Sequence, residues 1–168
     1  MKRIIGLVVA ILCIAGIIGC LAACGEDEPT QDSAKSMFCV TFQGVDIELG
    51  AEAKDILEAL GDAKSVKELG DCGGFGAQIK YTYDNFDIYT VKNDSGETID
   101  QITITNDLVA TSKNIINSSS KDAVINAYGT PDKEDNRSIR YVQDNLVLKF
   151  EIEDNAVSSI IYIRTSVE

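Results

Sequence analysis

Histidine and tryptophan are absent from this chain of 168 residues, and positive charge is scarce. The lack of histidine excludes the commonest general base, the commonest metal ligand and the Ser–His and Cys–His nucleophile systems. The 15 lysines and arginines face 27 aspartates and glutamates, which gives a net charge of −12. Since a chain this acidic is repelled by nucleic acid, we exclude nucleic acid as a partner.

Patterns that would bind a cofactor or a metal are missing as well. The glycine-rich stretch at 70–76 is not followed by the Lys-Ser/Thr of a phosphate loop, and the turn at Asp94 lacks calcium-loop spacing. Asp84 and Asp144 are the carboxylates that a glycosidase-like pair would use. Each precedes an asparagine, and Asp-Asn is expected in a hairpin turn for backbone reasons. The sequence therefore predicts no cofactor, no metal and no enzyme, with a carboxylate-based hydrolase as the remaining enzymatic alternative.

One long hydrophobic run is present, and it lies near the N-terminus. Residues 4–23 are uncharged and almost wholly apolar, and they follow Lys2 and Arg3. A short basic start followed by such a run is typical of a secretory signal peptide. The run is also nearly long enough to cross a bilayer, so an uncleaved membrane anchor is the alternative. Both interpretations place the rest of the chain outside the cytoplasm, because Lys2 and Arg3 favour the inside.

The end of this run carries a cysteine motif. Leu21-Ala22-Ala23-Cys24 resembles the lipobox of bacterial lipoproteins, and Gly25 also fits that pattern. The resemblance implies that the Cys24 thiol receives a diacylglyceryl group and that residues 1–23 are removed. Two acyl chains would hold the protein on a membrane. Cys20, which follows Gly19, is a second candidate for the lipid. The expected location is the cell membrane, with the chain lipid-anchored and facing outside the cytoplasm.

Two cysteines remain after the predicted processing. The chain has five, of which Cys13 and Cys20 leave with the signal peptide and Cys24 carries lipid. In an oxidising compartment, Cys39 and Cys72 are expected to form a disulfide. The alternative is a pair of buried thiols.

The predicted mature chain begins with an acidic tether at 24–36, followed by a single domain at 37–168. Alternating apolar residues predict a hairpin at 38–49. Ile56, Leu57 and Leu60 give one face of a helix at 51–60, which ends at Gly61. Residues 61–79 are expected to be loop-rich, and strands are expected at 78–83, 86–92 and 98–105.

A similar order follows in the second half. Ser119 and Asp122 resemble a capping box, so a helix is expected near 120–128, ending at Gly129. Strands are expected at 140–143, 146–153 and 157–163, and Asp-Asn pairs at 144–145 and 154–155 are expected in the turns. Within 146–153, alternate residues are expected to point into the core: Leu146, Leu148, Phe150 and Ile152.

The two halves can be aligned. ILEALG at 56–61 matches VINAYG at 124–129, and YTYDNFDI at 81–88 matches YVQDNLVL at 141–148. Repeats are therefore expected at about 37–107 and 108–168. The predicted fold is α+β, in which two tandem helix–three-strand meander repeats share one antiparallel sheet with both helices on one face.

This plan resembles lipid-anchored bacterial proteins of the SmpA/OmlA type, which carry a short helical part, a Gly-Pro-like stop and a three-stranded meander. It also resembles the beta-lactamase-inhibitor-protein-like fold, in which that unit occurs twice in one sheet. The resemblance covers about residues 45–163, and no functional residue of either group can be matched to this chain.

Protein binding by a membrane-anchored module of the cell envelope is the function that the sequence favours. Tyrosine suits such a surface, because it is large, stiff and polar at one end. The candidate binding face comprises Tyr81, Tyr83, Tyr89, Tyr141 and Lys149. For each tyrosine the alternative is a place in the core or a covering role on the sheet. The alternative function is binding of a small ligand or cell-wall fragment, which the lack of tryptophan disfavours.

Overall fold

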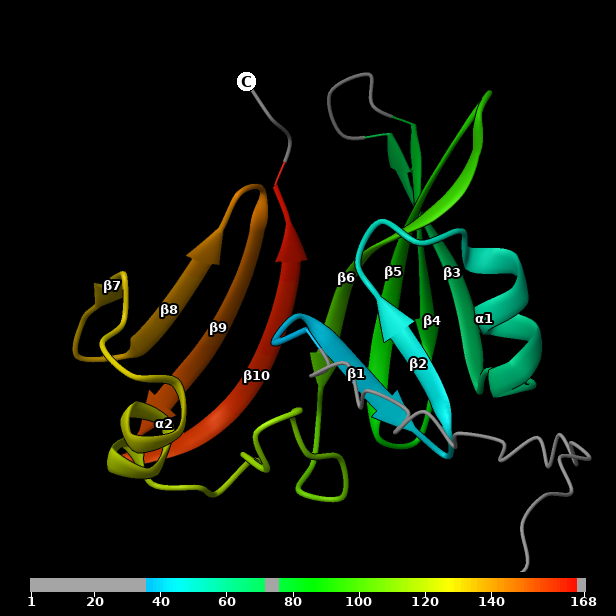
Figure 1. Ribbon diagram of the computed structural model, residues 1–168. Helices are drawn as coiled ribbons and strands as arrows, with labels where there is room; N and C mark the ends of the chain where they lie inside the picture. Colours follow the sequence, from blue (N-terminus) through cyan, green and yellow to red (C-terminus); the bar gives the residue numbers. More distant parts are fainter. Residues whose placement is uncertain (1–35, 72–75, 166–168) are drawn as a thin grey trace, which may run out of the picture. The chain divides into compact units, whose positions relative to one another are not determined.

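The computed structural model describes residues 36–71 and 76–165, all of which belong to one unit, Ser33–Glu168 (Figure 1). The predicted signal peptide, Cys20, Cys24 and Cys72 lie outside the described residues, as does all of the predicted tether except Ser36. In the described part of the chain, no helix is long and apolar enough to cross a membrane.

An eight-stranded antiparallel sheet forms most of this unit (Figure 1). Its strands, in spatial order, are β3 (Ser65–Asp71), β4 (Ala77–Thr82), β5 (Phe86–Asn93), β6 (Gly96–Ile104), β10 (Ala156–Arg164), β9 (Leu146–Glu153), β8 (Ser138–Gln143) and β7 (Lys133–Glu134). A separate hairpin consists of β1 (Cys39–Phe42) and β2 (Val45–Glu48). The two helices are α1 (Ala53–Leu60) and α2 (Lys121–Tyr128).

The turns and helix ends follow from local residue chemistry. Asp154 and Asn155 adopt φ values of 49° and 63° between β9 and β10, which is the left-handed region that tight hairpins need. Both helices end at a glycine, Gly61 after α1 and Gly129 after α2. The N-cap of α2 is Ser120, whose side chain accepts a hydrogen bond from the Ala123 N–H at 3.2 Å. The expected cap, one residue earlier, was therefore wrong by one position.

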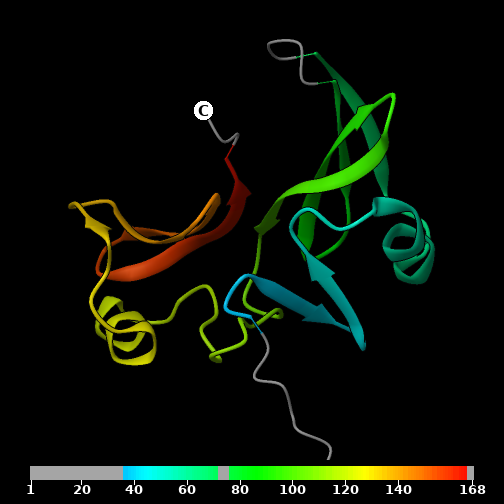
Figure 2. The same cartoon turned by 45° about the horizontal axis from the view of Figure 1, so that its top comes forward.

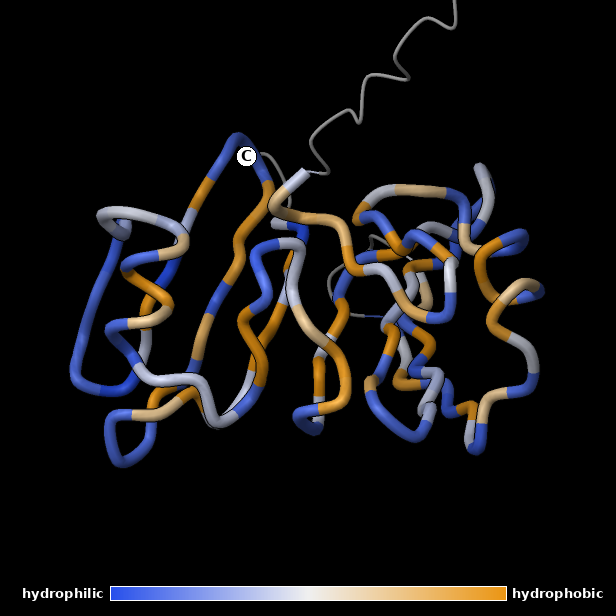
Figure 3. The backbone as a smooth tube through the Cα atoms, turned by 60° about the horizontal axis from the view of Figure 1, so that its bottom comes forward, coloured by the Kyte–Doolittle hydropathy of each residue, from blue (hydrophilic) through white to orange (hydrophobic). Residues whose placement is uncertain are grey.

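The core lies on one face of the sheet, where strand pairing aligns buried side chains into two rows. One row runs Tyr141, Leu148, Tyr162, Ile102, Ile88 and Tyr81. The other runs Ile139, Phe150, Ile160, Ile104 and Phe86. Figure 3 shows the matching alternation of hydrophobic and hydrophilic residues along the strands. We call this the inner face. The predicted inward residues of β9 are confirmed, since Leu148, Phe150 and Ile152 are buried and Leu146 packs against the core.

The hairpin and the helices add further side chains to the same core. Val40, Ile47 and Ala53 are fully buried, and the ring of Phe42 packs edge-on against Phe86 with centroids 5.0 Å apart. Figure 2 shows the hairpin as a layer separate from the large sheet, near β6. In the second half, the ring of Tyr128 from α2 packs on Phe150 at 5.4 Å.

The predicted fold class is wrong. The described chain is mostly β, with two helices, an eight-stranded sheet and a two-stranded sheet, and it does not consist of helix–three-strand meander repeats with both helices on one face. Part of the error lies in residues 61–79, which were expected to be loop-rich but contain β3 and the start of β4. All seven residues of β3, an edge strand of the sheet, are exposed, so neither face of this strand packs on the core. An exposed edge strand has no buried face, so it lacks the alternation that identifies a strand in a sequence.

Candidate functional site

The face of the sheet opposite the core, which we call the outer face, extends across β4, β5, β6, β10, β9 and β8. One row of side chains crosses it through Val142, Val147, Ile163, Gln101, Tyr89 and Lys80. A neighbouring row runs Arg140, Lys149, Ile161, Thr103, Asp87 and Thr82. Most of these side chains are half-buried, with Val142 at 40% exposure and Asp87 at 8% as the extremes.

Only two of the five predicted binding-face residues, Tyr89 and Lys149, share the outer face. Tyr81 pairs with buried Ile88, and Tyr141 pairs with buried Leu148, so both tyrosines lie on the inner face. Neighbouring residues of a strand point to opposite sides, which means that the register alone decides the face of each tyrosine.

The three remaining tyrosines make contacts within the fold. The Tyr141 hydroxyl donates to the carbonyl of Gly129 at 3.0 Å, and burial raises the pKa of Tyr141 to about 12. The pKa of Tyr81 is raised to about 12, mainly by burial and secondly by the hydrogen bond that its hydroxyl donates to Glu97 at 2.8 Å. Tyr83 packs its ring on Phe86, with centroids 5.1 Å apart.

A polar cluster surrounds Tyr89 on the outer face. The Nζ atom of Lys80 lies 5.4 Å from the centre of the Tyr89 ring and 2.9 Å from the carboxylate of Asp87. The hydrogen bond to Asp87 raises the pKa of Lys80, so this ammonium stays charged over the ring. The ion pair between Lys80 and Asp87 therefore holds the Lys80 ammonium beside the Tyr89 ring.

The other half of the outer face contains a group of aliphatic side chains beside Arg140 and Lys149. Val142, Val147, Ile161 and Ile163 lie side by side on β8, β9 and β10, and we call these four residues the aliphatic strip. An antiparallel sheet with one wet face normally alternates apolar residues inward with polar residues outward. The aliphatic strip departs from that pattern, since it presents half-exposed branched side chains on the side away from the core.

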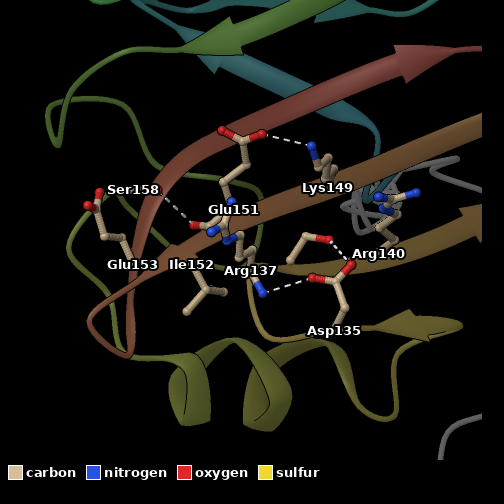
Figure 4. A pocket seen from close by; sticks show the side chains of 9 residues that line it. Asp135, Arg137, Arg140, Lys149, Glu151, Ile152, Glu153 and Ser158 are labelled. Carbon is tan, nitrogen blue, oxygen red and sulfur yellow. Dashed lines mark hydrogen bonds and ion pairs between the residues drawn. The ribbon is translucent and has the colours of Figure 1, made fainter.

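An open hollow of about 810 Å³ adjoins the strip on β8 and β9 (Figure 4). It is lined by Asp135, Arg137, Ser138, Arg140, Lys149, Glu151, Ile152, Glu153 and Ser158. Three of these side chains are cationic and three are carboxylates, in a chain whose net charge is −12. The hollow is thus locally neutral and far less acidic than the chain as a whole.

Two of the carboxylates in the hollow already have partners. Glu151 forms an ion pair with Lys149 at 2.7 Å. Asp135 accepts hydrogen bonds from the backbone N–H of Arg137 at 2.8 Å and from the Ser138 hydroxyl at 2.9 Å. Both hydrogen bonds lower the pKa of Asp135, and the bond from the Arg137 backbone has the larger effect. The Asp135 carboxylate is therefore ionised at neutral pH.

Sequence reasoning missed Arg137 and Arg140. The chain has four arginines, Arg3, Arg137, Arg140 and Arg164, so two of them fall within one stretch of four residues. Such a local gathering of guanidinium groups in an acidic chain is a signal that charge patterning alone could have revealed.

The carboxylates considered for hydrolysis are not brought together. Asp84 lies in the turn between β4 and β5, and Asp144 lies in the turn between β8 and β9, so β6 and β10 separate the two hairpins in the sheet. Asp84 instead forms an ion pair with Lys64. Across residues 36–71 and 76–165, no group of three or more acidic or cysteine side chains is arranged to hold a metal ion.

No protein-family model matches the chain, no curated protein is significantly similar to it, and no solved structure matches its fold. The lipobox interpretation therefore depends on residues 21–25 themselves.

Proposed function

We propose that this protein is a lipoprotein, anchored through Cys24 on the outer side of the cell membrane, whose outer sheet face binds a protein partner. The observation that carries this proposal is the aliphatic strip beside the Tyr89 cluster. The centres of protein interfaces are depleted in charge and enriched in tyrosine and apolar side chains. The outer face combines these features on a surface that the core does not use.

Partner capture by outer-face variants tests the binding proposal. The full chain, with its own N-terminal segment, serves as bait in detergent-solubilised membranes. Tyr89→Ala and Lys149→Glu are expected to weaken capture while costing little stability, because both side chains are only half-buried. Leu108→Ala is the matched control, since Leu108 is 75% exposed and lies outside the sheet. Capture that is equal in both outer-face variants and in the control would contradict the proposal.

The anchor is tested separately. Cys24→Ala is expected to leave an uncleaved precursor and to abolish metabolic labelling with a fatty acid, because the thiol is the acceptor of the lipid. Cys20→Ala is the matched control and is expected to be processed normally. If labelling persists in Cys24→Ala and disappears in Cys20→Ala, the anchor belongs to Cys20.

A second candidate function, binding of a small ligand or cell-wall fragment, is favoured by the hollow on β8 and β9. Its volume of about 810 Å³ falls within the range of small-molecule sites, and it is lined mainly by polar and charged side chains. Lys149 lines the hollow as well as lying on the outer face, whereas Tyr89 does not line the hollow, so Tyr89→Ala is the variant that separates the two functions.

A further inference from the structure

Arg140 carries a buried donor with no acceptor. Its side chain lies on the outer face beside Lys149, and it lines the hollow on β8 and β9 (Figure 4). The Nε atom is shielded from solvent and has no hydrogen-bond partner in the described structure. Buried donors are normally paired, and a donor in a charged group is especially costly to leave unpaired. Because Nε itself is shielded from solvent, a ligand in the open hollow has to approach half-buried Arg140 through its other guanidinium N–H groups.

Arg137 adds a second guanidinium to the same hollow. It precedes β8, and its backbone N–H is held by Asp135. Among the described residues, neither Arg137 nor Arg140 forms an ion pair with a carboxylate within 4 Å. Two nearby carboxylates have partners of their own. Asp135 accepts hydrogen bonds from Arg137 N–H and Ser138 within its turn, and Glu151 forms an ion pair with Lys149. Both arginines thus line one open space, and the Asp135 carboxylate, which interacts electrostatically with Arg140, forms no salt bridge with either of them within 4 Å.

We propose that this hollow binds a carboxylate group, held by the guanidinium groups of Arg137 and Arg140. The planar fork of arginine matches the two oxygens of a carboxylate, and such bonds are charge-assisted. A multiply charged anion fits less well, because Asp135, Glu151 and Glu153 surround the same space and repel it.

This inference does not depend on protein binding by the aliphatic strip. The carboxylate can belong to an acidic side chain of a protein segment or to a small organic acid, and both sources present the same chemistry to the two arginines. If Tyr89→Ala abolishes partner capture but leaves carboxylate binding intact, the two surfaces are separate. If carboxylate binding fails while partner capture persists, only the present inference is overturned.

The test is an NMR titration of the isotopically labelled full chain, purified in detergent. The probes are glutamate with both ends capped, capped glutamine as the neutral isostere, and inorganic phosphate. Saturable shifts are expected with capped glutamate at the backbone amides of Arg137, Arg140 and Glu151. No saturable shift is expected with capped glutamine, and weaker binding is expected with phosphate. Equal binding of glutamate and glutamine, or tighter binding of phosphate, would overturn the proposal.

Variants make the assignment specific. Arg140→Gln is expected to weaken binding of capped glutamate by about tenfold or more, and Arg140→Lys by a similar factor, because lysine keeps the charge but loses the fork. Arg137→Gln serves as a second variant, since Arg137 is exposed and its loss leaves the sheet intact. Arg164→Gln is the matched control, because Arg164 ends β10 and pairs with Asp100 outside the hollow. Unchanged affinity in both Arg140→Gln and Arg137→Gln would refute the site.

A final arm separates the two ligand sources. The same glutamate is placed within a short neutral peptide and compared with the capped residue. Tighter binding of the peptide assigns the hollow to a protein segment, whereas equal binding assigns it to a small acid. Both results support carboxylate recognition, and absence of binding by either probe contradicts it.

Discussion

Leu148 and Val147 are neighbours in β9 whose side chains lie on opposite faces of the sheet, and replacing each by alanine tests that assignment. Leu148 is fully buried on the inner face, between Tyr141 and Tyr162 in adjacent strands. Leu148→Ala removes buried carbon atoms and leaves a cavity between two rings, which is expected to lower the free energy of unfolding by about 2–5 kcal/mol.

Val147→Ala changes the outer face only. Val147 is half-buried in the aliphatic strip, between Val142 and Ile163. Its truncation is expected to cost less than about 1 kcal/mol, mainly through lower strand propensity. The expected loss in the free energy of unfolding is therefore several-fold larger for Leu148→Ala than for Val147→Ala, although both substitutions remove aliphatic carbon from the same strand.

Urea unfolding of the full chain in detergent, followed by circular dichroism, measures both effects. With a slope of about 2 kcal/mol per molar urea, Leu148→Ala is expected to lower the midpoint by roughly 1–2.5 M and Val147→Ala by less than about 0.5 M. An unchanged slope would show that both variants unfold from the same compact state. An equal loss in both variants, or a larger loss for Val147→Ala, would mean that the register of β9 is shifted by one residue.

Three further predictions concern tyrosine and cysteine. The Tyr162 hydroxyl is buried without a partner in the described structure, so Tyr162→Phe is expected to raise the urea midpoint or leave it unchanged, and a clear fall would reveal a missed hydrogen bond. The folded-state pKa values of Tyr81 and Tyr141 are raised to about 12, so their contribution to stability is fully present below pH 10 and is lost as the pH rises toward 12. Urea midpoints measured at pH 8, 10 and 11.5 check this, and midpoints that are equal at all three values would contradict it. Finally, if Cys39 and Cys72 form a disulfide, mass spectrometry of alkylated, non-reduced protein should find neither thiol modified, and two modified thiols would exclude the bond.

The sequence was sufficient to predict those strands that bury one face. The strand from Leu146 to Glu153 alternates between apolar and polar residues except at Val147, and an Asp-Asn pair marks the turn at each of its ends. Tertiary burial and turn chemistry favour the same structure there, so local reasoning succeeds. The edge strand β3 could not be found in this way, because its pairing with β4 gives it backbone hydrogen bonds without burying its side chains.

The candidate site was harder to predict than the strands. Tyr89 lies on the outer face and Tyr81 on the inner face, although both were grouped in one candidate binding face and both belong to clearly predicted strands. The decision depends on cross-strand register, which a single sequence does not contain. The hollow depends on the juxtaposition of Arg137 and Arg140 with β9, and this follows from the pairing of β8 with its neighbour rather than from any motif.

The position of β10 has a consequence for folding order. Of the strands that the structure describes, this one is synthesised last, yet it occupies the middle of the sheet, where Ile160 pairs with both Ile104 of β6 and Phe150 of β9. Until β10 arrives, β6 and β9 each have one unpaired edge, and the pairing of β10 with β6 must close a long stretch of chain. Non-local pairing of this kind favours folding in milliseconds to seconds rather than microseconds. A chain truncated before residue 156 would therefore lack the strand that connects β3–β6 to β7–β9. The edges of β6 and β9 would then be open to pairing with other molecules.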